Sequence, residues 1–292
     1  MTFVDRPVTV RVPATSANLG PGFDSLGLAL SWYDEVTAEV TESGLTFDIR
    51  GEGADEVPRD ETHLLYRAMD AAFDLLGEHP AGVHLTCRNT IPHGRGLGSS
   101  AAAIVAGVVL ARALVVGGAD RLDDRTLFGL ATDLEGHPDN VAPALFGGFT
   151  ISWVDGAAAE TLRLDVDVDV TVFVPPEAVA TSVARGLLPA EVPHADASFN
   201  AGRAALLVAA LTGAPERLIS ATEDRLHQTY RADAMPESYK LLRRLRVEGV
   251  PAVVSGAGPT VLAFAHGVQE WNPPGWAERE LRVSSQGAAL VP

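Results

Sequence analysis

A glycine-rich segment followed by two serines is the part of this sequence best suited to bind phosphate. Residues 91–107 read I-P-H-G-R-G-L-G-S-S-A-A-A-I-V-A-G. Glycines let the backbone adopt positive φ and approach a ligand closely, and the unpaired N–H groups in the first turn of a helix favour an anion. A strand-to-helix turn that is glycine-rich only for tight packing would have the same composition. The segment matches neither the lysine-containing P-loop nor the dinucleotide-binding pattern, so those two sites are excluded.

A polar cluster follows at residues 135–143, which read E-G-H-P-D-N-V-A-P. The polar side chains of this cluster are those of Glu135, His137, Asp139 and Asn140. They could bind a metal, act as acid and base, or merely form the polar end of a helix. The chain lacks the cysteine or paired-histidine spacing that a closed zinc site needs. Mg²⁺ prefers hard oxygen ligands, and Glu135 with Ser99 or Ser100 would supply a carboxylate and a hydroxyl beside phosphate oxygens.

Two arginines and a long loop carry groups that could orient a small polar ligand. Arg185 and Arg231 each present a guanidinium, which can hold a planar carboxylate with two parallel hydrogen bonds, although most arginines in proteins are simply solvated. Asn18 and Asp24 lie in the segment 13–24, P-A-T-S-A-N-L-G-P-G-F-D, where they could contact a ligand or only form turns. The residue types alone leave these alternatives open.

Several of these segments together resemble the motifs of the GHMP kinases, the superfamily that includes galactokinase, homoserine kinase and mevalonate kinase. The glycine-rich segment resembles the P-x-x-x-G-L-G-S-S-A-A motif, and residues 255–260, S-G-A-G-P-T, resemble the third motif. Residues 13–24 are similar to the first motif in its homoserine-kinase form, and residues 135–143 resemble the homoserine-kinase signature E-G-H-x-D-N-x-A-P. The patterns T-x-x-x-R at 181–185 and H-Q-x-Y-R at 227–231 also resemble homoserine-kinase segments. The motifs extend over nearly the whole chain.

The resemblance implies an ATP-dependent kinase that uses Mg²⁺ and converts L-homoserine to O-phospho-L-homoserine in threonine biosynthesis. It implies that the nucleotide is bound by Pro92, His93, Gly94, Arg95, Gly96, Leu97, Gly98, Ser99, Ser100, Ala101, Ala102, Gly256 and Gly258. The metal ligands would be Ser99, Ser100 and Glu135. The substrate would be contacted by Asn18, Asp24, His137, Asp139, Thr181, Arg185 and Arg231, and the catalytic groups would be Asn18, Glu135, Asn140 and Arg185.

Two positions depart from the pattern of the superfamily. Several relatives have an aspartate where Asn140 stands and use it as the base on the substrate hydroxyl, whereas an amide has no useful basicity. Transfer therefore proceeds without a protein base or another group serves, and a loose transition state makes the first alternative reasonable. The family also usually carries an asparagine near the adenine where this chain has Thr62 and His63, so the resemblance does not extend to an adenine contact at these two residues.

The periodicity of apolar residues indicates which elements position these groups. Strands are expected at residues 8–12, 83–90, 146–154, 162–166, 170–175, 253–254 and 261–264, and helices after the glycine-rich segment and at 64–76, 124–134, 199–211 and 237–247. Residues 33–50 alternate apolar and polar side chains around Ser43-Gly44, which predicts an antiparallel hairpin. Residues 13–24 are expected to form a long loop.

The resemblance implies an α/β (α+β) fold of two domains, with the site in the cleft between them. The first would be like ribosomal protein S5 domain 2 and the second ferredoxin-like. The acidic, alanine- and glycine-containing segment 155–160 is the expected junction. This gives an ATP-binding domain at residues 1–155 and a second domain at residues 156–292.

Composition limits the partners and the location of the protein. The net charge of −16 and the absence of a long basic run argue against nucleic acid. The single cysteine, Cys87, is expected to be a core residue. The apolar run 101–119 contains Arg112 and follows the glycine-rich segment, which favours a buried helix over a membrane span. The start shows no basic-then-apolar signal peptide, so a cytoplasmic location is expected.

Three functions remain to be distinguished. Homoserine kinase is favoured, and a mevalonate-type GHMP kinase is disfavoured by Asn140 and the two arginines. A non-catalytic metabolite sensor of the same fold is disfavoured by the intact Glu135 and serines. The family also leads us to expect a homodimer.

Overall fold

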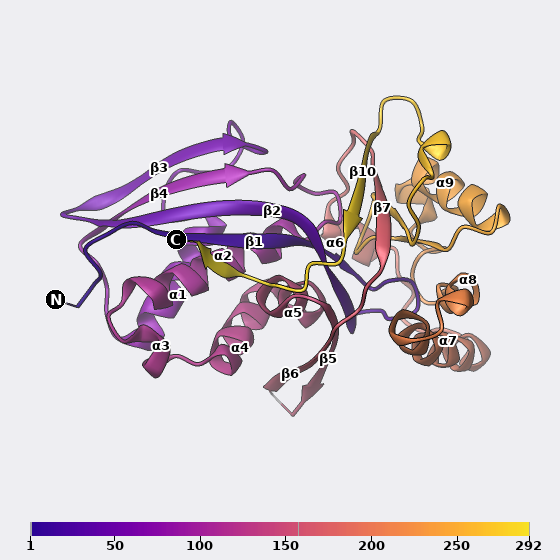
Figure 1. Ribbon diagram of the computed structural model, residues 1–292, viewed down its shortest axis with the longest axis horizontal. Helices are drawn as coiled ribbons and strands as arrows, with labels where there is room; N and C mark the ends of the chain where they lie inside the picture. Colours follow the sequence, from indigo (N-terminus) through magenta and orange to yellow (C-terminus); the bar gives the residue numbers. More distant parts are fainter. Residues whose placement is uncertain (1, 157, 292) are drawn as a thin grey trace.

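The computed structural model of this chain describes residues 2–156 and 158–291. Within them the strands form one seven-stranded and one four-stranded sheet (Figure 1). The larger sheet has the order β11-β1-β2-β4-β3, and β5 pairs with both β2 and β6. Its strands are β1 (Val8–Ala17), β2 (Leu26–Thr41), β3 (Gly44–Gly51), β4 (Gly82–Asn89), β5 (Phe149–Asp155), β6 (Ala158–Leu164) and β11 (Ala289–Val291).

Helices lie on one face of this sheet (Figure 1). They are α1 (Leu64–Leu76), α2 (Ser99–Leu114), α3 (Gly118–Arg121), α4 (Asp124–Glu135) and α5 (Pro138–Phe146). The expected helices at 64–76 and 124–134 are confirmed. α1 ends at Gly77, whose left-handed backbone (φ 65°) allows its N–H to reach back to the carbonyls of Phe73 and Asp74.

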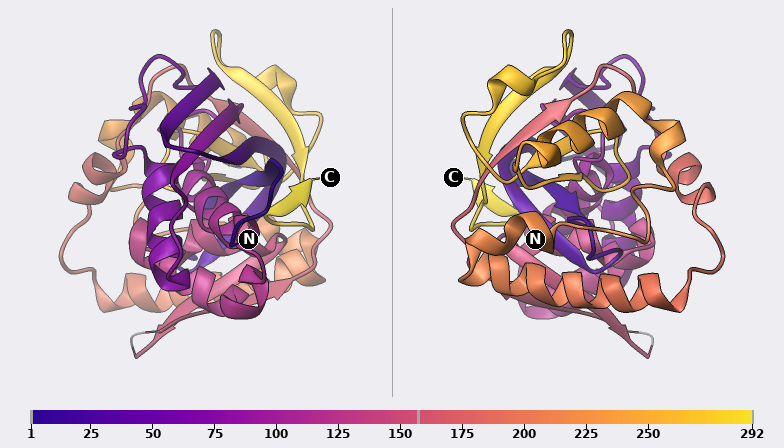
Figure 2. Two further views of the ribbon diagram at one scale, coloured as in Figure 1. Left: turned by 90° about the vertical axis from the view of Figure 1, so that its left-hand side faces the viewer. Right: turned by 90° about the vertical axis from the view of Figure 1, so that its right-hand side faces the viewer.

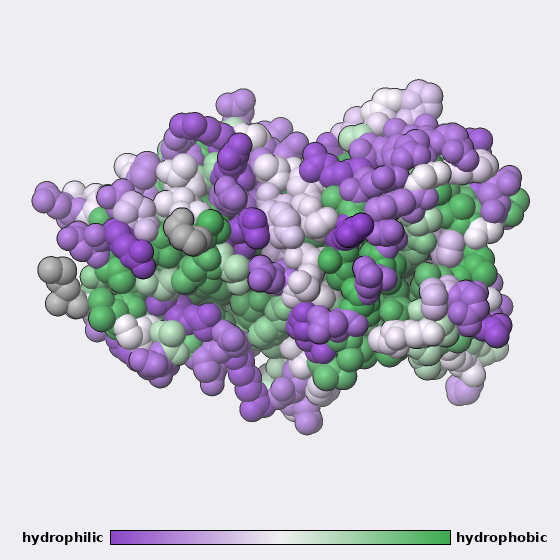
Figure 3. Space-filling view, viewed as in Figure 1, coloured by the Kyte–Doolittle hydropathy of each residue, from purple (hydrophilic) through white to green (hydrophobic). Residues whose placement is uncertain are grey.

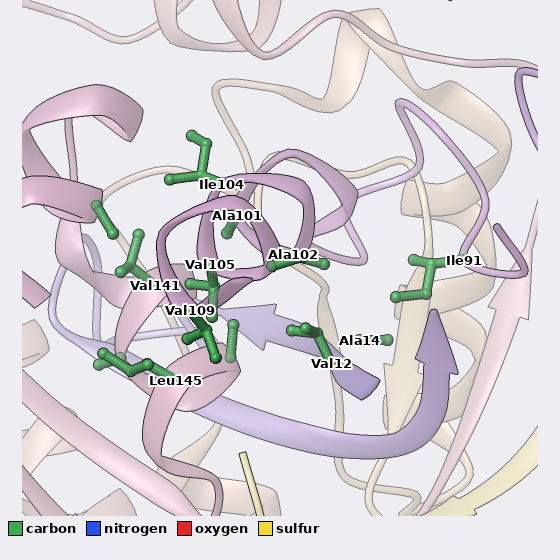
Figure 4. Close-up of a cluster of buried hydrophobic side chains, with 14 of the residues drawn as sticks. Val12, Ala14, Ile91, Ala101, Ala102, Ile104, Val105, Val109, Val141 and Leu145 are labelled. Carbon is green, nitrogen blue, oxygen red and sulfur yellow. The ribbon is translucent and has the colours of Figure 1, made fainter. Parts of the chain in front are cut away.

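The central helix of this layer is α2, which is apolar on nearly every side because it packs against β1, α1, α4 and α5. Figure 4 shows its side chains Ala102, Val105 and Val109 in one buried cluster with Val12 of β1 and Val141 of α5. The expected buried core helix is confirmed, and among the described residues no helix is both long and apolar enough to span a membrane. This packing fixes the N-terminus of α2, and with it the glycine-rich segment.

The antiparallel hairpin expected at residues 33–50 does not form. β2 and β3 are not neighbours, because β4 lies between them, antiparallel to β2 and parallel to β3. The chain reaches β4 from β3 through α1. An alternating pattern on two successive segments shows that each has one buried face, but it does not show which strand pairs with which.

The loop expected at residues 13–24 is also shorter than predicted. β1 continues through Ala17, and its pairing with β2 shifts register between Pro13 and Ala14. Proline has no N–H to donate to the ladder, and a bulge accommodates it without ending the strand. The irregular segment that follows is therefore confined to residues 18–25.

The smaller sheet is antiparallel and has the order β10-β7-β9-β8. Its strands are β7 (Asp169–Val174), β8 (Ala252–Val254), β9 (Val261–Ala263) and β10 (Ala277–Arg282). Counted along the chain this order is 4-1-3-2, the ferredoxin-like arrangement that the resemblance implied. The accompanying helices are α6 (Thr181–Gly186), α7 (His194–Thr212), α8 (Leu218–Ala221) and α9 (Pro236–Val247). In the side views of Figure 2 the long helix α7 runs across the edge of the molecule.

The strand pairing bears on where the two parts of the chain divide. The expected junction at residues 155–160 falls on the paired strands β5 and β6 of the larger sheet: Asp155 ends β5, residues 158–160 begin β6, and residue 157 lies outside the described residues. The last strand, β11, returns to the larger sheet and pairs with β1. We therefore propose that the division falls after β6, near residue 165, and that the first part also contains the C-terminal strand.

Candidate functional site

The glycine-rich segment leaves β4 and leads directly into α2. Gly94, Gly96 and Gly98 all have positive φ, at 66°, 72° and 69°. Gly98 is the N-cap of α2, so the N–H groups of the first helical turn point out of the loop. The backbone geometry expected of an anion site is therefore present.

A cavity of about 320 Å³ lies over this loop, where segments that belong to the larger sheet meet segments that belong to the smaller one. It is lined by Asn18, Gly94, Gly96, Gly98, Ser99, Ser100, Glu135, His137, Asp139, Asn140, Thr181, Arg185, Arg231, Gly256 and Ala257. We call it the polar cavity. It unites residues from all the separate segments that the sequence singled out.

A second cavity of about 320 Å³ adjoins it and shares Ser99 and Ser100. It is lined by Asp34, Val36, Val57, Pro58, Thr62, His63, Leu64, Leu65, Cys87, Asn89, His93, Ser99, Ser100, Ala102 and Ala103. We call it the apolar cavity. Its size and largely apolar walls suit a flat aromatic group.

Two hydrogen-bonded pairs bring carboxylates to the floor of the polar cavity. Ser100 Oγ donates to Glu135 Oε1 at 2.6 Å, and burial raises the pKa of Glu135. His137 Nδ1 lies 2.6 Å from Asp139 Oδ1, and this hydrogen bond raises the pKa of His137. Asp139 is 2% exposed. A serine hydroxyl and a carboxylate thus lie together beside the glycine-rich segment and the N-terminus of α2.

Asn140 is held by a residue that the sequence did not suggest. The hydroxyl of Thr15 on β1 donates to Asn140 Oδ1 at 2.7 Å. A Cβ added at Gly98 would lie 1.8 Å from that hydroxyl oxygen, so glycine is required here for space as well as for its positive φ. Because the amide oxygen of Asn140 accepts from Thr15, its NH₂ group is the part that can face a ligand.

Arg185 forms a two-pronged ion pair with Asp24. Its Nη2 and Nη1 donate to the two carboxylate oxygens at 2.7 and 3.1 Å, and this hydrogen bonding raises the pKa of Arg185. Asp24 itself does not line the polar cavity. Arg185 and Arg231 lie over the ring of Phe23, 5.7 and 5.5 Å from its centre.

Arg231 is buried without a carboxylate partner among the described residues. It is 1% exposed, and its guanidinium donates only to neutral acceptors: the carbonyls of Ala184 (3.2 Å) and Gly256 (3.3 Å) and His227 Nδ1 (3.1 Å). Burial, with the nearby Arg185 as a further cause, lowers the pKa of Arg231. A cation in this state gains most from a carboxylate that enters the cavity.

His227 connects Arg231 to the loop after β1. Its Nδ1 accepts from Arg231, so its Nε2 carries the proton and donates to the Gly20 carbonyl at 2.7 Å. Burial lowers the pKa of His227, which keeps it neutral. The H-Q-x-Y-R spacing could have revealed this contact, because residues four apart share one face of a helical turn.

Asn18 ties the first motif to the third. Its Nδ2 donates to the Gly256 carbonyl at 2.9 Å, and its Oδ1 accepts from the N–H of Asp24 at 2.9 Å. Asn18 and Asp24 have left-handed backbones (φ 66° and 55°), which these residue types tolerate better than most. Ser255 Oγ in turn donates to the carbonyl of Gly96 at 2.6 Å.

Not every residue expected to bind the nucleotide lines a cavity. Gly94, Gly96, Gly98 and Gly256 line the polar cavity, His93 and Ala102 line the apolar cavity, and Ser99 and Ser100 line both. Five others line neither: Pro92, Arg95, Leu97, Ala101 and Gly258. Leu97 and Ala101 are core residues. Arg95 instead donates to the carbonyls of His93, Pro175 and Pro176, which joins the loop to the end of β7.

The donor set at Ser99, Ser100 and Glu135 fits Mg²⁺ in kind. Within residues 2–156 and 158–291 no three His, Cys, Asp or Glu side chains gather as a metal site. Glu135 with the serine hydroxyls offers hard oxygen donors, which suit a cation that takes most of its remaining ligands from water and phosphate.

Comparison with known proteins agrees with this geometry. The family pattern described as "GHMP kinases N terminal domain" matches residues 63–148, and "GHMP kinases C terminal" matches residues 205–271. The chain is 59% identical to the homoserine kinase of Streptomyces avermitilis, over 98% of this chain and 96% of that protein. It is 54% identical to the homoserine kinase of Leifsonia xyli subsp. xyli, over 97% of this chain and 87% of that protein.

Solved structures show the same fold. The homoserine kinase of Cytophaga hutchinsonii superimposes with a TM-score of 0.84 at 24% identity, covering all of this chain and 99% of that one. The mevalonate kinase of L. major, solved with R-mevalonate, superimposes with a TM-score of 0.73 at 15% identity, covering 97% of this chain and 99% of that one. The first and second family patterns, the fold and the identity over nearly the full length lead to one conclusion: the chain belongs to the GHMP kinase family and, within it, to the homoserine kinases.

Proposed function

We propose that this enzyme transfers the γ-phosphoryl group of ATP to the hydroxyl of L-homoserine and so produces O-phospho-L-homoserine for threonine biosynthesis. The observation that carries the substrate assignment is Arg231, a buried guanidinium with only neutral acceptors at the wall of the polar cavity. An amino-acid carboxylate would supply the missing countercharge.

The two adjoining cavities support separate places for the nucleotide base and for homoserine. The nucleotide phosphates would lie over Gly94–Gly98 and the first turn of α2, where backbone N–H groups are available. The base would occupy the apolar cavity and homoserine the polar cavity, because the two meet at Ser99 and Ser100. Phosphoryl transfer would then take place at their junction.

The roles of individual side chains follow from their contacts. Glu135 and the serine hydroxyls would hold Mg²⁺, which when bound neutralises phosphate charge. Arg231 would bind the carboxylate, with Arg185 and its partner Asp24 positioning the amino-acid backbone. Asn18, Thr181, His137 and Asp139 would complete the substrate wall.

We infer that transfer proceeds without a protein base, and that the hydroxyl proton leaves to a phosphoryl oxygen or to water as the new O–P bond forms. Asn140 has its oxygen engaged by Thr15 and can only donate a hydrogen bond from its NH₂ group toward the reacting oxygens. Phosphoryl transfer through a loose transition state needs alignment of the hydroxyl more than its deprotonation. The residues around the junction would thus act by positioning and by charge stabilisation.

An ATP-consumption assay with and without candidate acceptors separates the three functions. Rapid ADP release with L-homoserine, and little with mevalonate, supports the proposal. Turnover of mevalonate would support the mevalonate-type kinase, and binding without turnover of either acceptor would support a sensor. The expected homodimer and the cytoplasmic location stay predictions, and sedimentation velocity and cell fractionation would test them.

A further inference from the structure

The apolar cavity contains one carboxylate that the phosphoryl-transfer site does not use. Asp34 lies on β2, and its neighbours on the same face are Val36 of β2 and Cys87 and Asn89 of β4. Asp34 is 8% exposed. A buried carboxylate on a mostly apolar wall is costly, and such a group is rarely present without a partner or a function.

Only one of its two oxygens is satisfied by the protein. Oδ1 accepts from the N–H groups of Thr90 (2.5 Å) and Ile91 (2.9 Å), at the exit of β4. The Thr90 hydroxyl, which lies near the carboxylate and lowers its pKa, donates to the Tyr33 carbonyl at 2.7 Å. In the described part of the chain no hydrogen bond of ordinary geometry reaches Oδ2 and Asp34 has no ion pair, yet Oδ2 is not among the fully buried atoms that lack a partner. Because Asp34 lines the cavity, we take Oδ2 to be the oxygen that faces into it.

The cavity around Oδ2 suits the ring of a purine. Val57, Pro58, Leu65 and Ala103 provide apolar walls. Burial raises the pKa of Asp34 from 3.8 to about 6, so near pH 8 the carboxyl is ionised and can only accept a hydrogen bond. The complementary ligand group is an N–H donor on the edge of an aromatic base.

We propose that Asp34 selects adenine over other purines by accepting a hydrogen bond from the 6-amino group at Oδ2. This inference rests on the proposed function and on the placement of the base in the apolar cavity. A purine without the 6-amino group leaves the buried carboxylate unsatisfied. A 6-oxo purine places lone pairs against it at the same position. Each of these effects lowers the affinity for the other purine by more than the hydrogen bond to the 6-amino group raises the affinity for adenine.

Asp34→Asn is the discriminating variant. The amide oxygen can keep the hydrogen bonds from the Thr90 and Ile91 N–H groups, which directs the NH₂ group into the cavity. A donor would then face the adenine amino group and would match a 6-oxo group. Glu35→Gln is the control, because it makes the same chemical change at the next position of β2, where the side chain points to the other face of the sheet.

The test compares ATP, purine riboside triphosphate and inosine triphosphate as phosphoryl donors at pH 8, with saturating homoserine. For wild type and Glu35→Gln we expect kcat/KM to be at least about tenfold higher with ATP than with purine riboside triphosphate. In Asp34→Asn this ratio should fall to about one or below, and the kcat/KM for inosine triphosphate should rise relative to that for ATP. Equal ratios in Asp34→Asn and wild type would overturn the assignment, as would an equal loss with all three donors.

Calorimetry with the corresponding diphosphates keeps the inference separate from the proposed activity. If homoserine is not phosphorylated, but wild type binds ADP at least about tenfold more tightly than purine riboside diphosphate and Asp34→Asn does not, the proposed function fails and the role of Asp34 stands. If Asp34→Asn does not fold, Asp34→Ser takes its place and should lose the same preference. Equal wild-type affinity for the two diphosphates would refute the contact.

Discussion

Glu135 is the carboxylate on which the metal assignment depends. Glu135→Gln keeps an oxygen that can accept from Ser100 Oγ, so the fold should be preserved. It removes the negative charge that would hold Mg²⁺, and we expect kcat to fall roughly a hundredfold or more. Turnover measured across a magnesium titration, with thermal melting as the control for folding, checks this. Near-normal turnover at saturating Mg²⁺ would contradict the assignment.

Asp34 should lower stability at neutral and alkaline pH. Its pKa is about 6 in the folded protein and 3.8 as the ordinary value, so the folded state holds the proton more strongly. The stability contributed by the neutral form is therefore complete below about pH 4 and is lost as the pH rises through about 6. Asp34→Asn should raise the free energy of unfolding by about 2–3 kcal/mol at pH 8.

Urea unfolding at two pH values tests this directly. The advantage of Asp34→Asn should be present at pH 8 and should shrink toward zero near pH 4, where the wild-type carboxyl is protonated. Glu35→Gln should show no comparable gain. A difference between Asp34→Asn and wild type that does not change with pH would mean that burial of the charge is not its cause.

Residue types identified most of the chemistry but not all of its partners. Arg185, Arg231 and Glu135 all reach the polar cavity, as their resemblance to homoserine-kinase segments implied. The pairing of Arg185 with Asp24 was not predictable, because no local pattern tells which distant carboxylate will face a guanidinium. Asp34 was missed for a similar reason: one polar residue on a strand does not reveal a cavity above it.

At the scale of elements, the glycine-rich segment is locked against the loop between β8 and β9. A Cβ added at Gly96 would lie 2.2 Å from the Ser255 carbonyl oxygen, and the φ of Gly96 is 72°. The loops must separate or distort to accept it. We expect Gly96→Ala to lower the free energy of unfolding by at least about 2 kcal/mol and to weaken nucleotide binding.

Gly129, inside α4, is the matched control. A Cβ there would meet nothing within 4 Å, and its φ is not in the left-handed region. Gly129→Ala should therefore stabilise the protein by about 0.5–1 kcal/mol and leave nucleotide affinity unchanged. Chemical unfolding and ADP calorimetry on both variants would show the contrast. Similar effects at the two positions would mean that close packing of the two loops is not what requires Gly96.

Helices and strands with a clear apolar periodicity were predicted well from the sequence, whereas the pairing of strands distant in the chain was not. α1 could be predicted because apolar residues recur at helical spacing up to Gly77. The hairpin expected at residues 33–50 was wrong because β4, a segment more than thirty residues further along, takes the position between β2 and β3. β10 was not predicted because its sequence, A-E-R-E-L-R, is mostly charged and its place is at the edge of a sheet.

At the scale of the whole molecule, the polar cavity is assembled from both parts of the chain. The N–H of Gly256 donates to the Ala17 carbonyl at 3.0 Å, and Arg95 reaches the end of β7. Hydrophilic residues cover much of the face seen in Figure 3, and the net charge is −16. An acidic protein needs positive potential concentrated at a site for anionic ligands, and the loop N–H groups with Arg231, which has no carboxylate partner among the described residues, would supply it.

The substrate assignment rests on the claim that Arg231 binds the carboxylate of homoserine. Arg231→Ala should weaken homoserine binding by about 1.5–3 kcal/mol and leave ATP affinity nearly unchanged. Arg231→Lys should recover little of the lost homoserine affinity, because the point charge of an ammonium cannot reproduce the two parallel hydrogen bonds of a planar guanidinium. Arg243→Ala, at an exposed arginine outside the polar cavity, should behave like wild type.

The most direct measurement is the steady-state kinetics of wild type and Arg231→Ala with L-homoserine and with 3-aminopropan-1-ol, which lacks only the carboxylate. Wild type should strongly prefer homoserine, by kcat/KM. Arg231→Ala should lose most of that preference, because homoserine suffers and the amino alcohol does not. An equal loss for both acceptors, or a loss confined to ATP, would contradict the binding of a carboxylate at Arg231 and with it the central support for homoserine as the substrate.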